Sequence, residues 1–477
     1  RDVDVERQIA DKLKMYPISD EEHRLYVLDQ IINDRGVLVD CELAKQAVKL
    51  NSIQSAVAVE QAYMITGLEN PNSVTQLKQW LKENGVEIES MSKKAVKSLA
   101  DETDGDVSKM LKLRLLMAKT SVKKYEAVIR SVCSDNRVHG MMRFCGANRT
   151  GRWSGNILQP QNLPQNHLPD LTLARDIVKD GDFEMLDMMF GNVPNVLSEL
   201  IRTVLIPKPN HRFIVADFSA IEARVLAWIA GEQWRIDTFK NGGDIYCASA
   251  SKMFKVPVEK NGVNGELRQK GKISELACGY GGSVGALKNM GAVEMGVQEN
   301  ELQGLINDWR NANPHIVRFW YEVGNAAMKA IKEKTTVPLG KLVFAYERGI
   351  LFIRLPSGRR LSYIKPRIGT NRFGGDSITY MGINSAKKWD RLETFGGKLT
   401  ENIVQGTARD LLANALINAA NAGYDTVFHV HDEIICEVPN GYGSVDELCR
   451  LMCIKPEWAD GLPLNADGFE CEYYKKE

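Results

Sequence analysis

Charged residues interrupt an apolar run in the segment HVHDEIICEVP, residues 429–439. His431, Asp432 and Glu433 stand at the centre of a pattern that predicts two buried strands joined by a tight corner. An ionised carboxylate is costly to desolvate, so charges in such surroundings need a partner. The strand-like segment FIVAD ends in the same way, at Asp217. The sequence therefore predicts two acidic residues at the ends of buried strands.

Two carboxylates at the ends of adjacent strands have the chemistry to bind divalent cations. Mg²⁺ prefers oxygen ligands and leaves positions for substrate phosphates. A pair of such ions, roughly 3.5–4 Å apart, stabilises the attacking and leaving oxygens of an in-line phosphoryl displacement. Taken singly, however, Asp217 or Asp432 is better explained as the cap of a turn, since Asp is common at strand ends.

A second chemical pattern lies in RQKGKISELACGYGG, residues 268–282. Arg268, Lys272, Leu276 and Tyr280 are spaced by four and share one slowly drifting helical stripe. Two cations one turn apart suit a triphosphate, and a tyrosine among glycines offers a ring for a base to stack on beside a flexible backbone. A plain amphipathic helix explains the stripe equally well.

Composition describes a soluble, globular, intracellular protein of several domains. The chain has 477 residues, of which 44% are hydrophobic and 26% charged, and no apolar run approaches the roughly 20 residues of a membrane span. Nine cysteines without a C-x-x-C pair indicate reduced thiols rather than disulfides or a zinc site. The 61 basic and 61 acidic residues cancel. A local basic run between Ser92 and Lys124 is explained equally by a solvated helical face and by a surface that follows phosphates.

The elements that must position these residues follow from periodicity. The first 130 residues predict helices, with Ser73 and Asn84-Gly85 as the cap and stop of one of them. A loop-rich stretch at 140–175 precedes the strand that ends at Asp217. Helices are then expected to about residue 332, strands in KLVFAYERGILFIRLPSGRRLSYI, and a long helix that ends at Gly423, before the hairpin of the opening segment.

Several segments resemble, in the same order, the motifs of the family A (DNA polymerase I-like) DNA polymerases. VADFSAIEARVLA, RQKGKISELACGYGG and HVHDEIICEVP are similar to motifs A, B and C of that family. Three further segments also match: NPNSVTQLKQWLKENGV resembles the thumb segment, RTGRWSGNILQPQNLP the T-G-R…Q-N-x-P segment, and VQGTARDLL the Q-G-x-A-x-D-L helix. GKISELACGYGGSVGAL and PEWADGLPLNADGFECEYYKK are most similar to the bacteriophage and prophage branch.

The resemblance implies roles for matching residues in catalysis and nucleotide binding. Asp217, Asp432 and the backbone carbonyl of Phe218 would bind two Mg²⁺ ions, for which Mn²⁺ could substitute, with Glu433 beside them as a further catalytic residue. Residues expected to contact the incoming dNTP are the steric gate Glu222, the triphosphate ligands Arg268 and Lys272, and Tyr280 beside the nascent pair.

Further residues match family positions that contact primer-template DNA. Arg152 and Gln405 would probe the minor groove at the primer terminus, where correct base pairs present acceptors at similar positions. Gln161 and Asn162 would touch the nucleic-acid backbone, and His431 would lie beside the primer end.

Some positions depart from the family pattern. Position 276 is Leu where better-known members carry Phe or Tyr, and residue 246 is Tyr where many have His. The start, RDVDVERQI, resembles the last helix of a 3′-5′ exonuclease domain, with Asp2 near its final metal-binding Asp. The chain as given is therefore interpreted as a fragment that does not proofread.

The predicted fold is α+β with a right-hand polymerase architecture: a palm with an antiparallel sheet, and helical fingers and thumb. The expected boundaries are an exonuclease remnant and linker at 1–35, thumb at 36–131, palm at 132–231 and 396–477, and fingers at 232–395. The predicted function is DNA-templated DNA synthesis from dNTPs in phage replication, by a monomer in the cytoplasm of a bacterial or infected cell, with unidentified replisome partners.

Three alternatives are weighed against this prediction. A single-subunit RNA polymerase is disfavoured because Glu222 stands where an RNA enzyme needs room for the 2′-hydroxyl. A metal-dependent nuclease would use Asp217 and Asp432 but leaves the stripe from Arg268 to Tyr280 unexplained. A non-catalytic template-primer binder would not need the acidic pair.

Overall fold

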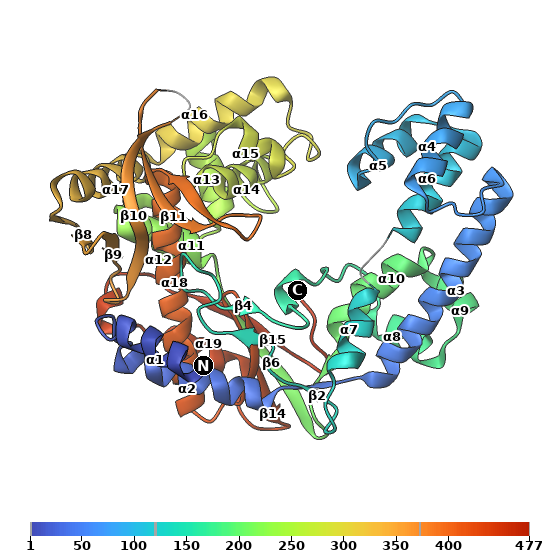
Figure 1. The fold of residues 1–477 in the computed structure, drawn as a ribbon, viewed down its shortest axis with the longest axis horizontal. Coiled ribbons are helices and arrows are strands. Elements are labelled where there is room, and N and C mark those ends of the chain that lie inside the picture. The colour runs from blue at the N-terminus through green and yellow to red at the C-terminus, as the bar shows by residue number, and fades with distance from the viewer. Residues whose placement is uncertain (1, 119–121, 372–373, 477) are drawn as a thin grey trace.

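The computed structural model of the chain describes residues 2–118, 122–371 and 374–476. Two arms rise from a central body and face each other across an opening (Figure 1). Helices and antiparallel sheets are mixed, as expected for the α+β class, and every strand pair in the described residues is antiparallel. No helix within the described ranges is both long and apolar enough to cross a membrane.

A four-stranded sheet forms the floor of the central body. Its spatial order is β13 (Thr426–Val430), β14 (Glu433–Pro439), β6 (His211–Phe218) and β15 (Ala466–Cys471). The predicted hairpin is confirmed, because β13 pairs with β14 and residues 431–432 form the corner between them. The predicted strand that carries Asp217 is also confirmed, as β6.

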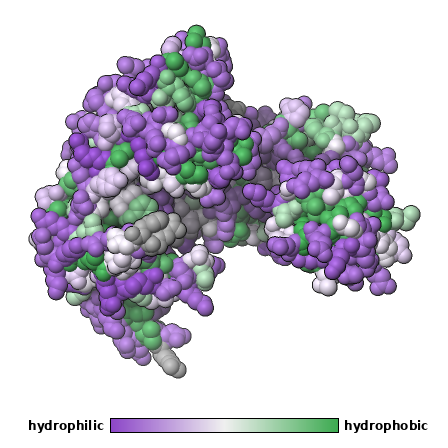
Figure 2. Space-filling view, turned by 90° about the horizontal axis from the view of Figure 1, so that it is seen from above, coloured by the Kyte–Doolittle hydropathy of each residue, from purple (hydrophilic) through white to green (hydrophobic). Residues whose placement is uncertain are grey.

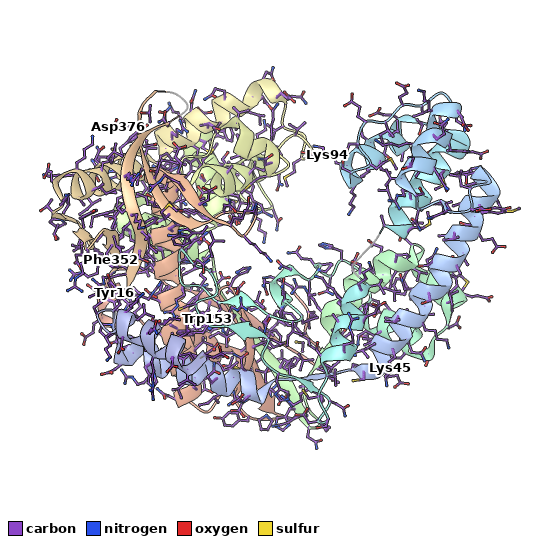
Figure 3. All side chains as sticks on the ribbon, in the orientation of Figure 1. Tyr16, Lys45, Lys94, Trp153, Phe352 and Asp376 are labelled. Atoms are coloured by element: carbon purple, nitrogen blue, oxygen red, sulfur yellow. The ribbon has the colours of Figure 1, made fainter. Side chains whose placement is uncertain are left out.

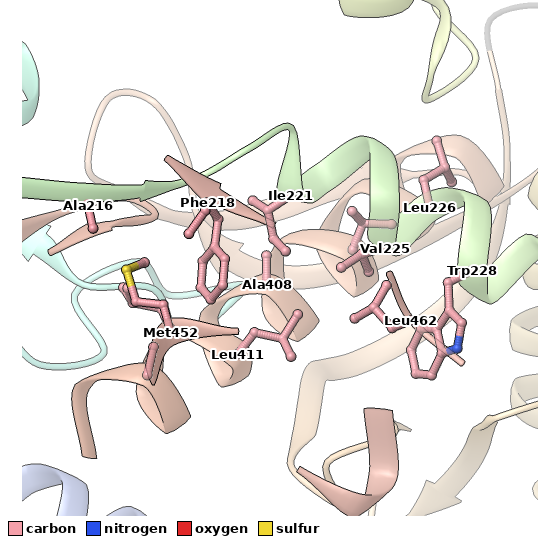
Figure 4. Packing of buried hydrophobic residues seen from close by; sticks show 14 of the residues in the cluster. Ala216, Phe218, Ile221, Val225, Leu226, Trp228, Ala408, Leu411, Met452 and Leu462 are labelled. Atoms are coloured by element: carbon pink, nitrogen blue, oxygen red, sulfur yellow. The ribbon is translucent and has the colours of Figure 1, made fainter. Parts of the chain in front are cut away.

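Side chains alternate between the two faces of this sheet and join two separate cores. On one face Ile214, Ala216 and Phe218 of β6 pack with α11 (Ile221–Ala230) and α18 (Gly396–Asn421); Figure 4 shows Phe218 and Ile221 beside Ala408 and Leu411. On the other face Phe213 and Val215 belong to a second core. By the same alternation Asp217 lies on the face of Phe213 and Val215, at the end of β6.

The predicted long helix is confirmed as α18, which packs on one face of the sheet. The other helices of the central body are α1 (Asp2–Leu13), α2 (Asp20–Arg35) and α19 (Val445–Met452). Short pieces complete it: β1 (Val37–Val39), β2 (Arg137–Val138) and β5 (Leu205–Ile206) form one small sheet, and β3 (Met142–Arg143) and β4 (Ser154–Gly155) another. Along the described ranges the 3-10 turns are η1 (Pro160–Asn162), η2 (Ile201–Val204), η3 (Glu299–Glu301) and η4 (Glu457–Ala459), of which η3 belongs to the left-hand arm of Figure 1.

The left-hand arm in Figure 1 combines helices with a six-stranded sheet. The helices are α12 (Gln233–Lys240), α13 (Ile245–Phe254), α14 (Leu267–Cys278), α15 (Val284–Asn289), α16 (Leu302–Ala312) and α17 (Pro314–Glu333). The strands, in spatial order, are β12 (Trp389–Thr394), β11 (Asp376–Ile383), β10 (Arg360–Thr370), β9 (Ile350–Arg354), β8 (Leu342–Glu347) and β7 (Thr336–Leu339). The apolar side of α17 covers this sheet and joins it to α18.

The right-hand arm is helical. It contains α3 (Cys41–Thr66), α4 (Val74–Glu83), α5 (Lys93–Glu102), α6 (Gly105–Met117), α7 (Lys123–Ser131), α8 (Leu171–Asp180), α9 (Phe183–Phe190) and α10 (Val193–Leu200). Ser73 caps α4 as predicted, because its hydroxyl accepts a hydrogen bond from the backbone N–H of Gln76 at 3.4 Å. The tip of the arm has its own small apolar core, and Figure 2 shows a largely hydrophilic surface with a hydrophobic cluster on this arm.

Candidate active site

Three acidic residues lie side by side across the central sheet. In the strand register Glu433 of β14 and Asp467 of β15 flank Asp217 of β6 on its two sides. Asp432 lies at the adjacent hairpin corner, and its backbone carbonyl accepts a hydrogen bond from the N–H of Phe218 at 3.2 Å. The structure thus brings together the two aspartates that the sequence places at strand ends. Asp467 was not among the predicted residues, because no apolar run marks it in the sequence.

Burial dominates the electrostatics of this group, and repulsion among the carboxylates adds to it. Burial, reinforced by the nearby carboxylates of Asp432 and Glu433, raises the pKa of Asp217 to about 8. Burial also raises the pKa of Asp432. The Oδ1 atom of Asp217 is buried and has no hydrogen-bond partner among the described residues. A half-buried acidic pair with one buried, unpartnered oxygen fits a bound cation, which would supply the missing positive charge.

The oxygen ligands that the protein offers fit a cation whose remaining ligands come from a substrate. No group of three His, Cys, Asp or Glu side chains within the described ranges forms a complete metal site. Mg²⁺ is typically held by one or two carboxylates, with water and substrate phosphates as the remaining ligands. The Phe218 ring is buried in the core, so that residue offers only its backbone carbonyl. The described residues therefore fit a site that is completed by substrate.

Substitution of Asp217 by asparagine should change how stability depends on pH. The folded state holds a proton on Asp217 up to about pH 8, whereas the unfolded carboxyl has its ordinary pKa of 3.8. Stability is therefore lost as pH rises between these values. In the absence of divalent ions we expect Asp217→Asn to be more stable than the unsubstituted protein at pH 8 by about 1–3 kcal/mol.

Urea denaturation at several pH values, with and without Mg²⁺, checks this expectation. Mg²⁺ should stabilise the unsubstituted protein more than Asp217→Asn, because binding to the folded state raises its stability. If the variant shows the same change of stability with pH as the unsubstituted protein, the raised pKa does not belong to Asp217.

Glu433 is buried and held by the C-terminal segment. The hydroxyl of Tyr474 donates a hydrogen bond to Glu433 Oε1 at 2.7 Å, and Lys476 Nζ lies 3.8 Å from Oε2. Arg202 in turn donates to the Tyr474 hydroxyl at 3.1 Å. Burial nevertheless raises the pKa of Glu433. This carboxylate is therefore fixed by protein partners, and no pattern in the sequence indicates its contact with the C-terminal segment.

Glu222 receives hydrogen bonds from two of the predicted residues. Arg152 donates to its Oε1 at 2.7 Å, and the hydroxyl of Tyr280 donates to Oε2 at 2.7 Å. Tyr280 lies just beyond the end of α14, so this bond links the α14 end of the left-hand arm to the start of α11. Three residues predicted from separate motifs thus form one network.

The loop that carries Arg152 is fastened to α18. Arg359 donates to the carbonyl of Thr150 at 2.8 Å and to that of Gly406 at 2.9 Å, and pairs with Asp410 at 2.6 Å. Arg409 donates to the carbonyl of Gly151 at 3.0 Å. Arg359 and Arg409 were not among the predicted site residues. Their signal in the sequence was weak, because arginine side chains are usually solvated.

Arg268 forms one wall of a polar cavity of about 820 Å³. Its guanidinium forms an ion pair with Asp244 at 2.8 Å and lies over the ring of Tyr246, 5.2 Å from its centre. The cavity is also lined by Lys240, Lys260 and Lys455. Its cationic wall suits a polyanionic ligand. The sequence leaves the role of Tyr246 uncertain. In the structure its ring contacts Arg268, which is predicted to bind the triphosphate.

Lys272 follows Arg268 by one helical turn on α14 and is half-buried. Leu276 is 52% exposed on the same helix, so this departure from the family pattern lies on an accessible surface.

A smaller cavity of about 180 Å³ collects most of the predicted DNA contacts. Arg152, Gln161 and His431 line it together with Trp153, which Figure 3 places in the central body. Asn162 is exposed at the end of η1.

Gln405 lies apart from that cavity. It is on α18, with its amide 3.5 Å from Glu401 Oε1, and none of the described hydrogen bonds joins it to Arg152.

Comparison with known proteins gives concordant results. The model of DNA polymerase family A matches residues 41–455. A DNA polymerase of Bacillus phage SP02 is 52% identical over 480 residues, which cover 100% of this chain and 74% of the phage protein. The thermostable DNA polymerase I of Thermus aquaticus is 27% identical over 265 residues, covering 54% of this chain and 27% of that protein.

The same fold occurs in a solved structure, the POL domain of Pol1 from M. smegmatis in complex with DNA primer-template and dNTP. It aligns with a TM-score of 0.65 at 21% identity, over 95% of this chain and 69% of that chain. This likeness establishes the polymerase architecture that the sequence predicted.

Proposed function

This chain belongs to DNA polymerase family A, and we propose that it extends a DNA primer on a DNA template by two-metal nucleotidyl transfer during phage replication. The chain is a DNA-directed DNA polymerase, as its family and its phage relative establish. The observation that carries the proposed mechanism is the convergence of Asp217 and Asp432 at one end of the central sheet.

The proposed domain boundaries are those expected from the sequence. The palm contains the central sheet, from 132–231 and 396–477. The fingers at 232–395 comprise the left-hand arm, and the thumb at 36–131 comprises α3 to α7 of the right-hand arm. Lys94 on α5 lies at the inner edge of the thumb (Figure 3), which favours a phosphate-contacting role for the basic run over a solvated face.

Family A DNA polymerases generally depend on divalent metal ions. In this chain Asp217, Asp432 and the carbonyl of Phe218 would hold two Mg²⁺ ions, with Mn²⁺ as a substitute. Such ions, when bound, stabilise charge on the attacking 3′-oxygen and on the leaving pyrophosphate. The palm residues contribute a rigid, apolar floor that fixes both carboxylates. Tyr474 and Lys476 hold the carboxylate of Glu433 beside them.

Arg268 and Lys272 would bind the triphosphate of the incoming dNTP. Arg268 is directed into the cationic cavity by Asp244, and Lys272 lies one turn along the same helix. Positioning and charge neutralisation dominate phosphoryl transfer, so these cations would orient the α-phosphate toward the primer 3′-hydroxyl. Tyr280 would lie beside the nascent base pair.

Five residues are proposed to contact the primer-template duplex: Arg152, Gln161, Asn162, Gln405 and His431. One polar cavity in the palm is lined by Arg152, Gln161 and His431. Arginine and glutamine donors can check minor-groove acceptors without reading sequence, as copying requires.

Glu222 is proposed to exclude ribonucleotides, because its carboxylate is held in place by Arg152 and Tyr280. We expect Glu222→Ala to raise the ratio of rNTP to dNTP incorporation by about 10- to 200-fold, the range typical of steric discrimination in a pocket. Single-nucleotide primer extension with matched rNTP and dNTP measures this ratio. Glu222→Gln, which keeps the side-chain size, serves as the control and should remain selective.

Two results would contradict this proposal. Efficient extension by the unsubstituted protein with rNTPs alone would contradict the choice of dNTPs as substrate. An unchanged rNTP-to-dNTP ratio in Glu222→Ala would contradict the role of Glu222.

A further inference from the structure

An antiparallel hairpin of the left-hand arm, β11–β12, is not used by the mechanism above. Ile383 of β11 pairs with Trp389 of β12, and residues 384–388 form the turn between them. The turn is internally bonded, since the N–H of Asn384 donates to the carbonyl of Lys388 at 2.8 Å and Asn384 Oδ1 accepts from the Lys388 N–H at 3.0 Å. In Figure 1 the hairpin is drawn in orange on the side of the left-hand arm that faces the opening. The tip is therefore an ordered projection.

The hairpin is anchored to the loop that carries Arg152. Arg149, three residues earlier, donates to the carbonyl of Ser362 at 2.9 Å and stacks over Tyr380 of β11 at 4.5 Å. Its guanidinium also packs on Gly382, where an added Cβ would lie only 2.7 Å from Nη2. The end of β11 next to the turn therefore has a fixed position relative to the loop that carries Arg152.

The far end of β12 reaches the dNTP side of the site. Phe395, directly after β12, is 58% exposed, and its ring carbon lies 3.9 Å from the position of a Cβ on Gly281. Gly281 follows Tyr280 in the sequence. From Phe395 back to Trp389 the strand spans about 20 Å at roughly 3.3 Å per residue. β12 thus extends over the length of several nucleotides, from the position next to Gly281 to the tip beside Arg149.

The tip exposes an aromatic ring beside cations. Trp389 is 57% exposed, which is unusual for so large an apolar side chain. Lys387 and Lys388 are exposed and form no ion pair within the described part of the chain. The neighbouring acid, Asp390, is instead bonded to the amide of Asn384 at 3.3 Å and to the N–H of Arg391 at 2.7 Å.

We propose that the β11–β12 hairpin binds the single-stranded template ahead of the insertion site, with Trp389 stacked on a base and Lys387 and Lys388 against phosphates. Stacked aromatics beside unpaired cations are the chemistry by which proteins hold single strands without reading sequence. The positive charge at the tip favours nucleic acid over an apolar protein partner. The contact of Arg149 with Tyr380 and Gly382 holds the hairpin beside the polymerase site, which favours the template strand as its ligand. This inference rests on the proposed function, because the template is identified by the polymerase site beside it.

Fluorescence anisotropy with two labelled DNAs tests the proposal: a primer-template with a long 5′ template overhang, and a blunt duplex of the same paired length. We expect Trp389→Ala to weaken binding of the overhang DNA by about 5- to 100-fold, with little change for the blunt duplex. Trp389→Phe should restore most of the affinity. Tyr321→Ala, which removes an aromatic residue 69% exposed on α17, is the matched control and should bind both DNAs normally.

Salt dependence tests the two lysines separately. Each phosphate of a single strand that a lysine neutralises contributes roughly 0.7 to the slope of log affinity against log salt concentration. Removal of both lysines in Lys387→Ala/Lys388→Ala should therefore reduce the magnitude of this slope by about 1.4 for the overhang DNA. Extension by one nucleotide on a template with a one-nucleotide overhang should be preserved in all hairpin variants. Loss of that extension would count against the proposed function, whereas its preservation leaves the proposed function intact and isolates the hairpin.

Three outcomes would overturn the proposal. Overhang binding could be unchanged in both hairpin variants, or the affinities for overhang and blunt DNA could fall by the same factor. The third is a defect seen only when a downstream duplex is present, which would assign the hairpin to the displaced strand. Thermal melting of each variant establishes that the comparison is made between folded proteins.

Discussion

Asp432→Asn is expected to reduce primer extension by about 10²- to 10³-fold or more, the cost typical of losing one preorganised electrostatic stabiliser in an active site. The substitution keeps the size of the side chain at the hairpin corner and removes the charge that a cation at this site would require. The hydrogen bond from the N–H of Phe218 goes to the backbone carbonyl of Asp432, so the strand register should survive.

Single-turnover extension and duplex binding by the same variant provide the measurement. Binding of primer-template should change little, because the proposed duplex contacts come from other residues. Asp425→Asn is a matched control on the same hairpin: Asp425 immediately precedes β13 and pairs with Arg35 at 2.8 Å. Unchanged extension by Asp432→Asn would refute its metal role, and an equal loss in the control would point to a damaged hairpin instead.

Lys272→Ala is expected to lower kcat/KM for dNTP by about 10²-fold, since a charge-assisted contact to a developing phosphoryl charge supplies transition-state stabilisation of this order. Duplex affinity should stay within a few-fold of the unsubstituted protein, because α14 is proposed to contact the nucleotide and not the duplex. Steady-state incorporation of one nucleotide at varied dNTP concentration, with anisotropy for duplex affinity, separates the two effects.

Lys270→Ala is the matched control for this experiment. Lys270 lies on the same helix, but its ammonium group already pairs with Glu301 at 3.1 Å. Its removal should leave kcat/KM nearly unchanged. Equal losses of dNTP use and duplex binding in Lys272→Ala would indicate a disturbed helix rather than a lost triphosphate contact.

Local structure around the site could be predicted from the sequence. Short apolar runs predicted β6 and the β13–β14 hairpin, and a long helical pattern with a terminal glycine predicted α18. The two aspartates stood out because charges within buried strands demand a partner. These signals are local, since they depend on neighbours within a few residues.

The sequence by itself thus determined the family, the main elements and the residue types able to bind metal, nucleotide and DNA. Only the tertiary structure decided which partners hold the site and its surroundings: Tyr474 on Glu433, Arg152 and Tyr280 on Glu222, and Arg149 on the carbonyl of Ser362 in β10. These contacts join residues 41, 70, 58 and 213 positions apart, respectively. No periodicity encodes such pairs, because they arise when separate elements pack and each buried polar group must find a partner.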